Sequence, residues 1–186
     1  MNLMVGVLVT LLLHSLTVGC SKVGYELKTK LFTNYSLLIP PTPLNLTLDI
    51  KLSSLIGLTI KDEVLQLAVW EYWSWRDARL TWSPEEFQGI KEISVYGQDI
   101  WIPDVLLINT IKEVVNFVEP GSSVIQIRYD GMVFRNQIVI TTTGCDATVT
   151  FFPFDQQDCS LQFSSLNLKQ TELTLNPRFT VKERMR

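Results

Sequence analysis

The spacing of apolar positions along the chain changes near residue 40. Before that point, over Tyr25–Leu38, apolar side chains recur at helical spacing, at Leu27, Leu31, Tyr35 and Leu38. Three prolines between residues 40 and 43 then oppose any continuation of a helix. The sequence therefore predicts one short N-terminal helix.

After the prolines the period becomes two, which is typical of a strand with one wet face. Leucines and Ile50 occupy the even positions of residues 44–52, while polar side chains occupy the odd positions. A second extended region runs from Leu55 through Trp75 and is aromatic at its end. Shorter strands are predicted at Ile90–Val95, Ile111–Val118, Ser123–Tyr129, Gly131–Thr143, Cys159–Leu166 and Glu172–Phe179.

Turn residues separate several of these strands, and Asp130-Gly131 is a hairpin signal. Many short strands that follow a single helix are typical of layered all-β proteins. We therefore predict an all-β fold, an antiparallel β-sandwich with a short N-terminal helix.

The start of the chain has the features of a secretory signal. An apolar run from Leu3 to Leu13 ends in small residues before Cys20, and it is shorter than the roughly 20 residues that a membrane span needs. We expect residues 1–20 to be a signal peptide and residues 21–186 to be the domain that enters the secretory pathway. Cleavage after Cys20 leaves two cysteines, whereas cleavage before Cys20 leaves an odd thiol.

The two later cysteines, Cys145 and Cys159, enclose a segment rich in phenylalanine and aspartate. A bridge between them would close a loop of about 15 residues and add roughly 3 kcal/mol in the loop-entropy model. Spacing alone favours a structural staple between neighbouring strands. Two sequons, which begin at Asn34 and Asn45, are candidate glycosylation sites of a secreted chain.

Composition and the types of residue present argue against several classes of function. The 186 residues suffice for one domain, and the net charge of −3 with no basic cluster argues against a nucleic-acid surface. His14 is the only histidine and lies in the predicted signal, so the remaining chain has no Ser-His or Cys-His pair and no histidine metal site. No glycine-rich phosphate loop is present. We expect no enzyme, no cofactor and no metal site.

Tryptophans stand at fixed offsets ahead of the cysteine pair, and the two features together carry a family resemblance. The chain resembles the extracellular ligand-binding domain of Cys-loop (pentameric ligand-gated ion channel) receptors, on the branch of serotonin type 3, nicotinic acetylcholine and zinc-activated channels. The matching stretches are Leu31–Tyr35, Trp70 to Phe87, Ile100–Leu107 and Cys145 to Leu161, the last with Phe-Pro-Phe-Asp at 152–155.

The resemblance implies a sandwich subunit in a ring of five, with a small-molecule neurotransmitter or other small agonist held between neighbouring subunits by aromatic side chains. Ring faces attract a cationic amine by about 0.5–2 kcal/mol per contact. Trp70 matches a ligand-binding tryptophan of the complementary face. Phe152, Pro153, Phe154 and Asp155 match the loop that couples binding to the membrane domain, and the disulfide Cys145–Cys159 gives that loop its name. The family's mainly structural positions match Trp75, Trp82, Trp101, Pro103 and Asp104.

Two residues depart from the amine-binding pattern. Leu166 stands where the principal face carries a tryptophan, and Ile108 stands where nicotinic members place a tyrosine. The chain is therefore a poor principal partner for an ordinary amine, but a plausible complementary partner through Trp70. The segment from Ser74 to Trp82 is similar to the zinc-activated channel, which shares the leucine at 166, so the agonist class stays open.

Family subunits continue with two more strands and four membrane helices, so we expect a sandwich truncated before its last two strands. Such a chain would reach the membrane only through the missing domain or through partner subunits, at the extracellular face of the plasma membrane. The predicted function is the extracellular ligand-binding portion of a neurotransmitter-gated cation channel subunit. The alternatives are a soluble secreted ligand-binding or decoy module, and an immunoglobulin-like domain, whose cysteines would link strands far apart in sequence.

Overall fold

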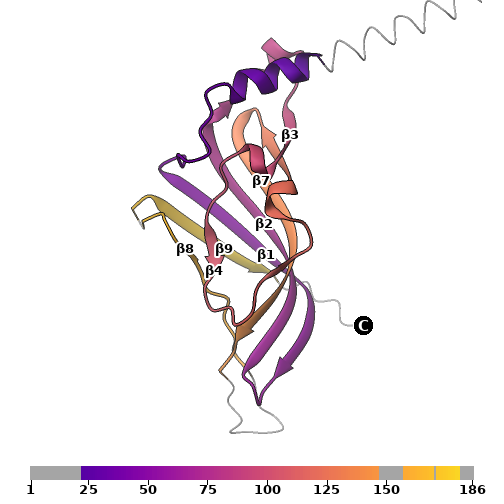
Figure 1. The fold of residues 1–186 in the computed structure, drawn as a ribbon, viewed down its shortest axis with the longest axis vertical. Coiled ribbons are helices and arrows are strands. Elements are labelled where there is room, and N and C mark those ends of the chain that lie inside the picture. Colours follow the sequence, from indigo (N-terminus) through magenta and orange to yellow (C-terminus); the bar gives the residue numbers. More distant parts are fainter. Residues whose placement is uncertain (1–21, 147–156, 170, 181–186) are drawn as a thin grey trace, which may run out of the picture.

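The computed structural model describes residues 22–146, 157–169 and 171–180. Residues 22–32 are helical, and strands make up most of the remaining described chain (Figure 1). The strands are β1 (Leu44–Thr59), β2 (Val64–Thr81), β3 (Glu92–Tyr96), β4 (Val105–Leu107), β5 (Val115–Asn116), β6 (Val124–Arg128), β7 (Asp130–Gly144), β8 (Phe163–Ser165) and β9 (Leu173–Thr180). Short 3-10 helices lie in the connections, at η1 (Pro84–Phe87), η2 (Gly97–Asp99) and η3 (Pro120–Ser122).

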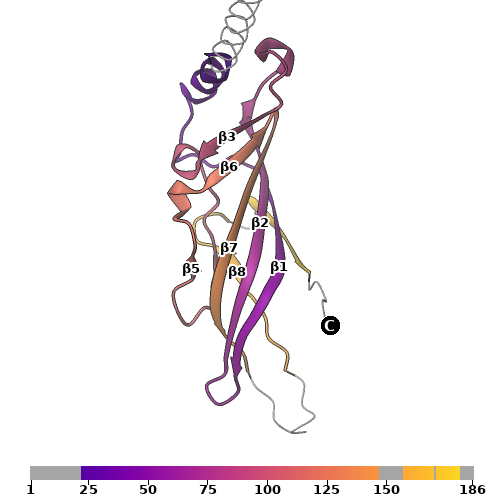
Figure 2. The same ribbon diagram turned by 90° about the vertical axis from the view of Figure 1, so that its right-hand side faces the viewer.

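The described strands form two sheets, which confirms the predicted β-sandwich with a short helix. The larger sheet has the order β3-β6-β7-β2-β1-β9, with β5 also paired to β7, and the smaller sheet is β4-β8. Figure 2 shows β1, β2 and β7 running together along the length of the molecule. Every described strand pair is antiparallel except β1–β9, where Leu44 lies opposite Leu173 in a parallel register.

Side-chain alternation places the core between the sheets. In β2 the odd-numbered side chains from Leu65 to Trp75 are buried and the even-numbered ones face outward. Trp73 reaches across to β8, where its ring meets the ring of Phe163 edge to face at 6.3 Å. Burial of each large apolar side chain stabilises the fold by roughly 1.5–3 kcal/mol. The predicted alternation of β1 is also confirmed, because Leu44, Leu46, Leu48 and Ile50 are buried.

The predicted helix was too long, because the helical residues end at 32 and not at Leu38. Tyr35, which fits the apolar spacing, instead donates its hydroxyl to Asp77 Oδ2 at 2.8 Å and accepts from the Trp101 amide at 3.1 Å. Leu38 is 91% exposed and belongs to no apolar helix face. Hydrogen bonds to distant strands and loops therefore outweighed the local periodicity.

The predicted boundary between the first two strands was wrong. β1 continues to Thr59, and the turn falls at residues 60–63, where Glu63 has a positive φ of 54°. Register shifts between Leu52 and Ser54 and between Leu55 and Gly57 interrupt the alternation, so one long strand looked like two. β4 was missed because three residues carry too little periodicity, and the strand predicted at Ile111–Val118 shrinks to the two residues of β5.

The Asp-Gly hairpin between β6 and β7 is confirmed. Gly131 has a φ of +82°, and a Cβ atom there would lie 2.6 Å from the carbonyl oxygen of Asp77. Arg128 donates to both oxygens of Asp130, and these hydrogen bonds lower the pKa of that carboxyl group. The turn therefore requires glycine for its backbone and is closed by an ion pair.

A largely buried ion pair within β2 is hydrogen-bonded to the segment after the helix. Asp77 is fully buried and accepts from Arg79 Nε at 2.8 Å and from Arg79 Nη2 at 2.6 Å. Arg79 also lies over the ring of Tyr35, 4.4 Å from its centroid. The hydrogen bonds that Arg79 donates to Asp77 raise the pKa of Arg79, while burial raises the pKa of the Tyr35 phenol. The network fixes the end of β2 against the rest of the domain.

Candidate functional site

Trp70 lies on the outward face of the large sheet. It is an even-numbered residue of the central strand β2, and 39% of it is exposed. Its ring stacks on the neighbouring outward residue, Tyr72, with centroids 6.2 Å apart and planes 19° from parallel. A strand that is paired on both sides fixes the backbone positions from which these two rings project. The face therefore offers an aromatic surface, on a well-paired sheet, to a ligand or to a neighbouring molecule.

Cations already lie against this aromatic face. Lys51, directly opposite Trp70 on β1, places its Nζ 4.6 Å from the centroid of the Tyr72 ring. On β7, Phe134 has the Arg128 guanidinium 5.6 Å from its centroid. These contacts show that the rings of Tyr72 and Phe134 attract positive charge on this face of the sheet. Tyr72 and Lys51 were not predicted from the sequence, although the period of two would have placed Tyr72 on the same face as Trp70.

The smaller sheet carries the two residues that depart from the amine-binding pattern. Leu166, which follows β8, is 69% exposed, and Ile108, which follows β4, is also exposed. Asp104 fixes this segment by accepting from Ser165 Oγ at 2.6 Å and from the Asn167 amide at 2.8 Å. The two aliphatic side chains therefore lie on the other layer from Trp70 and offer no aromatic face.

Cys145 and Cys159 form a disulfide, with Cα atoms 4.9 Å apart. The Cys145 amide donates to the carbonyl oxygen of Glu63 at 2.8 Å, so the base of the loop is tied to the turn between β1 and β2. The predicted coupling residues, Phe152, Pro153, Phe154 and Asp155, lie outside the described residues, as does the predicted signal at 1–20. The candidate glycosylation residues are described, and both side chains, Asn34 and Asn45, are exposed.

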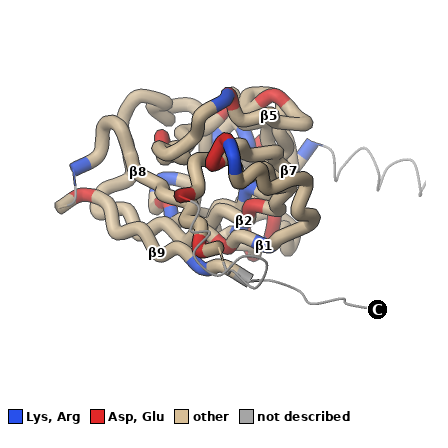
Figure 3. Tube along the Cα trace, turned by 90° about the horizontal axis from the view of Figure 1, so that it is seen from below, with Lys and Arg blue, Asp and Glu red and all other residues tan. Residues whose placement is uncertain are grey.

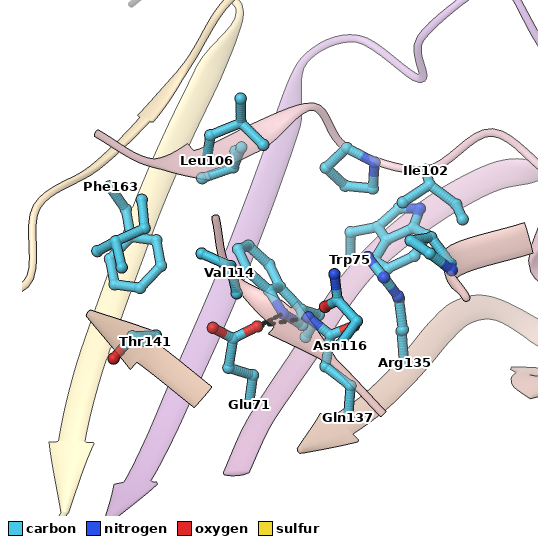
Figure 4. Close-up of a pocket in the computed structure, with 15 residues that line it drawn as sticks. Glu71, Trp75, Ile102, Leu106, Val114, Asn116, Arg135, Gln137, Thr141 and Phe163 are labelled. Atoms are coloured by element: carbon cyan, nitrogen blue, oxygen red, sulfur yellow. Dashed lines mark hydrogen bonds between the residues drawn. The ribbon is translucent and has the colours of Figure 1, made fainter. Parts of the chain in front are cut away.

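A cavity of about 320 Å³ lies between the two sheets (Figure 4). Apolar side chains from the segment around β4 form one wall, and β2 and β7 form the other. Glu71 is buried here, and its Oε2 accepts from Trp73 Nε1 at 3.0 Å and from Gln137 Nε2 at 2.6 Å. Arg135 is 9% exposed, and burial lowers the pKa of its guanidinium group while Glu71 opposes that shift. This cavity was not predicted from the sequence.

Charge over the rest of the described chain is mixed. Figure 3 shows lysine and arginine positions interspersed with aspartate and glutamate, the pattern of an ordinary solvated surface. Within residues 22–146, 157–169 and 171–180, no three His, Cys, Asp or Glu side chains gather in a group that could hold a metal ion. No helix in this part of the chain has the length and apolar character to span a membrane.

Comparison with known families shows to which protein family the chain belongs. Residues 25–185 match the family model of the neurotransmitter-gated ion-channel ligand-binding domain. The chain belongs to this family. The match covers most of the helix, both sheets and the disulfide-closed loop, so the resemblance expected from the tryptophans and cysteines is confirmed.

Curated relatives are subunits of acetylcholine receptors. The chain is 34% identical over 163 residues to acetylcholine receptor subunit alpha-like 2 of Drosophila melanogaster, which covers 85% of this chain and 28% of the relative. It is 33% identical over 149 residues to human neuronal acetylcholine receptor subunit alpha-9, covering 77% of this chain and 31% of the relative. Neuronal acetylcholine receptor subunit beta-2 of Gallus gallus is 33% identical over 148 residues, with coverage of 77% and 30%. The chain thus spans about a third of the length of these relatives or somewhat less.

Proposed function

We propose that this ligand-binding domain is the extracellular portion of a neurotransmitter-gated cation channel subunit that acts beside other subunits in a pentamer. The observation that carries the proposal is the exposed Trp70, stacked on Tyr72 on a rigid sheet face. An ammonium group placed against such a ring gains about 0.5–2 kcal/mol. The names of the relatives make acetylcholine the first agonist to test.

The proposed role is on the complementary side of the agonist site. Trp70 can supply one aromatic wall, whereas Leu166 and Ile108 offer only aliphatic surface where an amine-binding principal face needs rings. A second subunit would then supply the principal face. The arrangement supports agonist binding between chains and gives no support to catalysis, so we propose neither an enzymatic activity nor a cofactor.

The secretory features are part of the same proposal. We assign residues 1–20 as a signal peptide, and the exposed Asn34 and Asn45 as glycan acceptors on the extracellular side. Loss of mass on enzymatic removal of N-glycans checks this assignment. Phe152 to Asp155 are assigned to contact with a membrane domain, supported by the tie between Cys145 and the β1–β2 turn at the base of that loop.

The test is acetylcholine binding by a mixed assembly. The chain is co-secreted with the extracellular domain of human alpha-9, the assembly is isolated by size-exclusion chromatography, and acetylcholine binding is measured by calorimetry. Trp70→Ala should weaken binding by about 2- to 30-fold, the equivalent of one cation–π contact, and leave assembly intact. The matched control is Tyr129→Ala, which removes an aromatic side chain of similar exposure and should leave affinity unchanged.

Two results would contradict the assignment. Equal affinity of the Trp70→Ala and unsubstituted assemblies would remove Trp70 from the site. Tight acetylcholine binding by the chain without a partner would favour the alternative, a soluble secreted ligand-binding or decoy module.

A further inference from the structure

The sequon at Asn45 lies on the same face of the large sheet as Trp70. β1 runs between β2 and β9 (Figure 1). The even-numbered side chains at the start of β1 are buried in the core, so the odd-numbered ones, from Asn45 to Lys51, face outward. Lys51 is paired with Trp70 and Asp49 with Tyr72, and both partners are outward residues of β2. The register shifts of β1 begin only after residue 52, so Asn45 shares the face of the two rings.

The distance from Asn45 to the aromatic pair is short on the scale of a subunit interface. Asn45 is four residues from Asp49, the partner of Tyr72, which places it roughly 13 Å along β1 and about 5 Å to the side of β2. A stable interface covers about 800 Å² on each partner, a patch of roughly 16 Å radius if it is circular. An interface of that size that is centred on Tyr72 therefore includes Asn45.

Asn45 also lines a hollow in which the first sugars of a glycan would lie against the sheet. The hollow has a volume of about 530 Å³, and its wall includes Pro41, Pro43 and Arg76. Proline rings offer apolar surface to the face of a sugar ring, and the exposed Arg76 side chain offers hydrogen-bond donors to sugar hydroxyls. A glycan that makes these contacts lies along the sheet and does not project freely into solvent.

We propose that an N-glycan on Asn45 covers this part of the outward face and keeps a neighbouring subunit from docking there. N-glycans are bulky and hydrated, whereas the centre of a protein interface excludes water. The glycan and the neighbouring subunit therefore compete for one surface, and only chains without sugar at Asn45 assemble through Trp70. The proposal rests on the secretory and complementary-face assignments of the proposed function.

The chain offers matched controls for this role. Asn34 is also an exposed sequon residue, but it lies in the turn after the helix and on no strand, so Asn34→Gln removes a glycan from elsewhere on the domain. Thr47 is on the outward face of β1. Thr47→Val removes the sequon at Asn45 while it keeps the asparagine itself and a β-branched side chain in the strand.

The first experiment tests the cover without a partner subunit. Ser74→Cys, opposite Thr47 on β2, places a thiol on the outward face, and Ser164→Cys places one on the smaller sheet. The chain is secreted from cells that add N-glycans, and labelling by a bulky polyethylene-glycol maleimide is timed by gel mobility. Asn45→Gln and Thr47→Val should each speed labelling at position 74 by about fivefold or more, because they remove the bulky sugar. Labelling at position 164 should stay unchanged, and Asn34→Gln should affect neither rate.

The second experiment measures assembly. The unsubstituted chain is co-secreted with the extracellular domain of human alpha-9, the assembled and unassembled fractions are separated by size-exclusion chromatography, and mass spectrometry gives the occupancy of Asn45 in each. Sugar at Asn45 should be depleted by about tenfold or more in the assembled fraction, because the covered face cannot dock. Asn45→Gln and Thr47→Val should raise the assembled fraction in proportion to the share of chains that carried the sugar, and Asn34→Gln should leave it unchanged.

Several results would overturn the inference: a secreted chain without sugar at Asn45, unchanged labelling at position 74 after removal of the sequon, or equal occupancy of Asn45 in the two fractions. An effect of Asn34→Gln as large as that of Asn45→Gln would also do so. Faster labelling in the variants without assembly by any of them would contradict the complementary role of the chain, and with it the competition, while the cover by the glycan would stand. The failure of the proposed function is thus distinguishable from the failure of this inference.

Discussion

At the scale of single residues, Asp77 is the most deeply buried charged side chain of the described chain. Its carboxylate has no exposed surface and takes hydrogen bonds from the Arg79 side chain, the Arg79 amide and the Tyr35 hydroxyl. The ion pair between Lys30 and Glu86 has a similarly short distance of 2.9 Å, but both of its side chains are more than half exposed. Because the Asp77–Arg79 pair is more buried, we expect it to contribute more to the free energy of unfolding than the Lys30–Glu86 pair, although the distances are similar.

Asp77→Asn should lower the free energy of unfolding by about 2–3 kcal/mol, because Arg79 loses its carboxylate partner in a largely buried site. Glu86→Gln, the exposed control, should cost less than about 1 kcal/mol. Urea denaturation followed by tryptophan fluorescence measures both. Equal losses in the two variants would contradict the assignment of Asp77 as a structural anchor.

Some features of single residues could be predicted from the sequence, and others could not. Exposure of Trp70 follows from the parity of β2, and the pairing of Cys145 with Cys159 was expected from the family resemblance. The contact of Lys51 with Tyr72 depends on the register between β1 and β2, which the two bulges obscure. Arg135 could not be predicted as a buried cation, because an arginine in a strand is ordinarily assigned to the wet face.

At the scale of elements, the hairpin between β6 and β7 depends on one glycine. Gly131 combines a positive φ with a close approach to the backbone of Asp77, so the turn and the end of β2 fit together only without a Cβ atom. Gly57, in β1, has nothing within 4 Å of the place where a Cβ would lie. Position 131 therefore requires glycine, whereas position 57 has room for a side chain, so Gly57 is a matched control for Gly131.

Gly131→Ala should destabilise the domain by more than about 2 kcal/mol, through left-handed backbone strain and the clash with Asp77. Gly57→Ala should be neutral or slightly stabilising, because alanine restricts the unfolded chain at no steric cost. Thermal unfolding by circular dichroism compares the two. A stable Gly131→Ala variant would mean that the turn can relax away from β2.

Element boundaries were harder to predict than element types. Long strands with clear alternation, such as β7, matched the pattern to within a residue. The predicted bounds of the helix and of β1 did not match. The helix ends early because Tyr35 takes part in a hydrogen-bond network, and β1 was divided because its alternation changes parity at its bulges. The parallel partner of β1 could not be predicted, since local pattern carries no information on which distant strand will pair with it.

At the scale of the whole molecule, the disulfide joins the end of β7 to the segment that leads into β8 and to the smaller sheet. Cys145 is buried and also bonded to the β1–β2 turn, so the bridge connects both layers. Its sequence separation of 14 makes the restriction of the unfolded chain appreciable.

Replacement of both cysteines by serine should lower stability by about 3 kcal/mol in the loop-entropy model. Denaturation of the secreted chain with and without the substitutions measures this. Wild-type protein treated with a reductant should lose a similar amount, which separates the effect of the bond from that of the serine side chains. A loss below about 1 kcal/mol would mean that the layers hold together without the bridge.

The parallel pairing of β1 with β9 also has a consequence for biosynthesis. Ribosomes deliver the chain from its N-terminus, so Leu44 is available long before its partner Leu173 is made. Until then one edge of β1 has no strand beside it, and unpaired edges are where nascent chains associate wrongly. The large sheet can therefore be completed only after β9 has been synthesised, when the first strand of the domain pairs with the last one described.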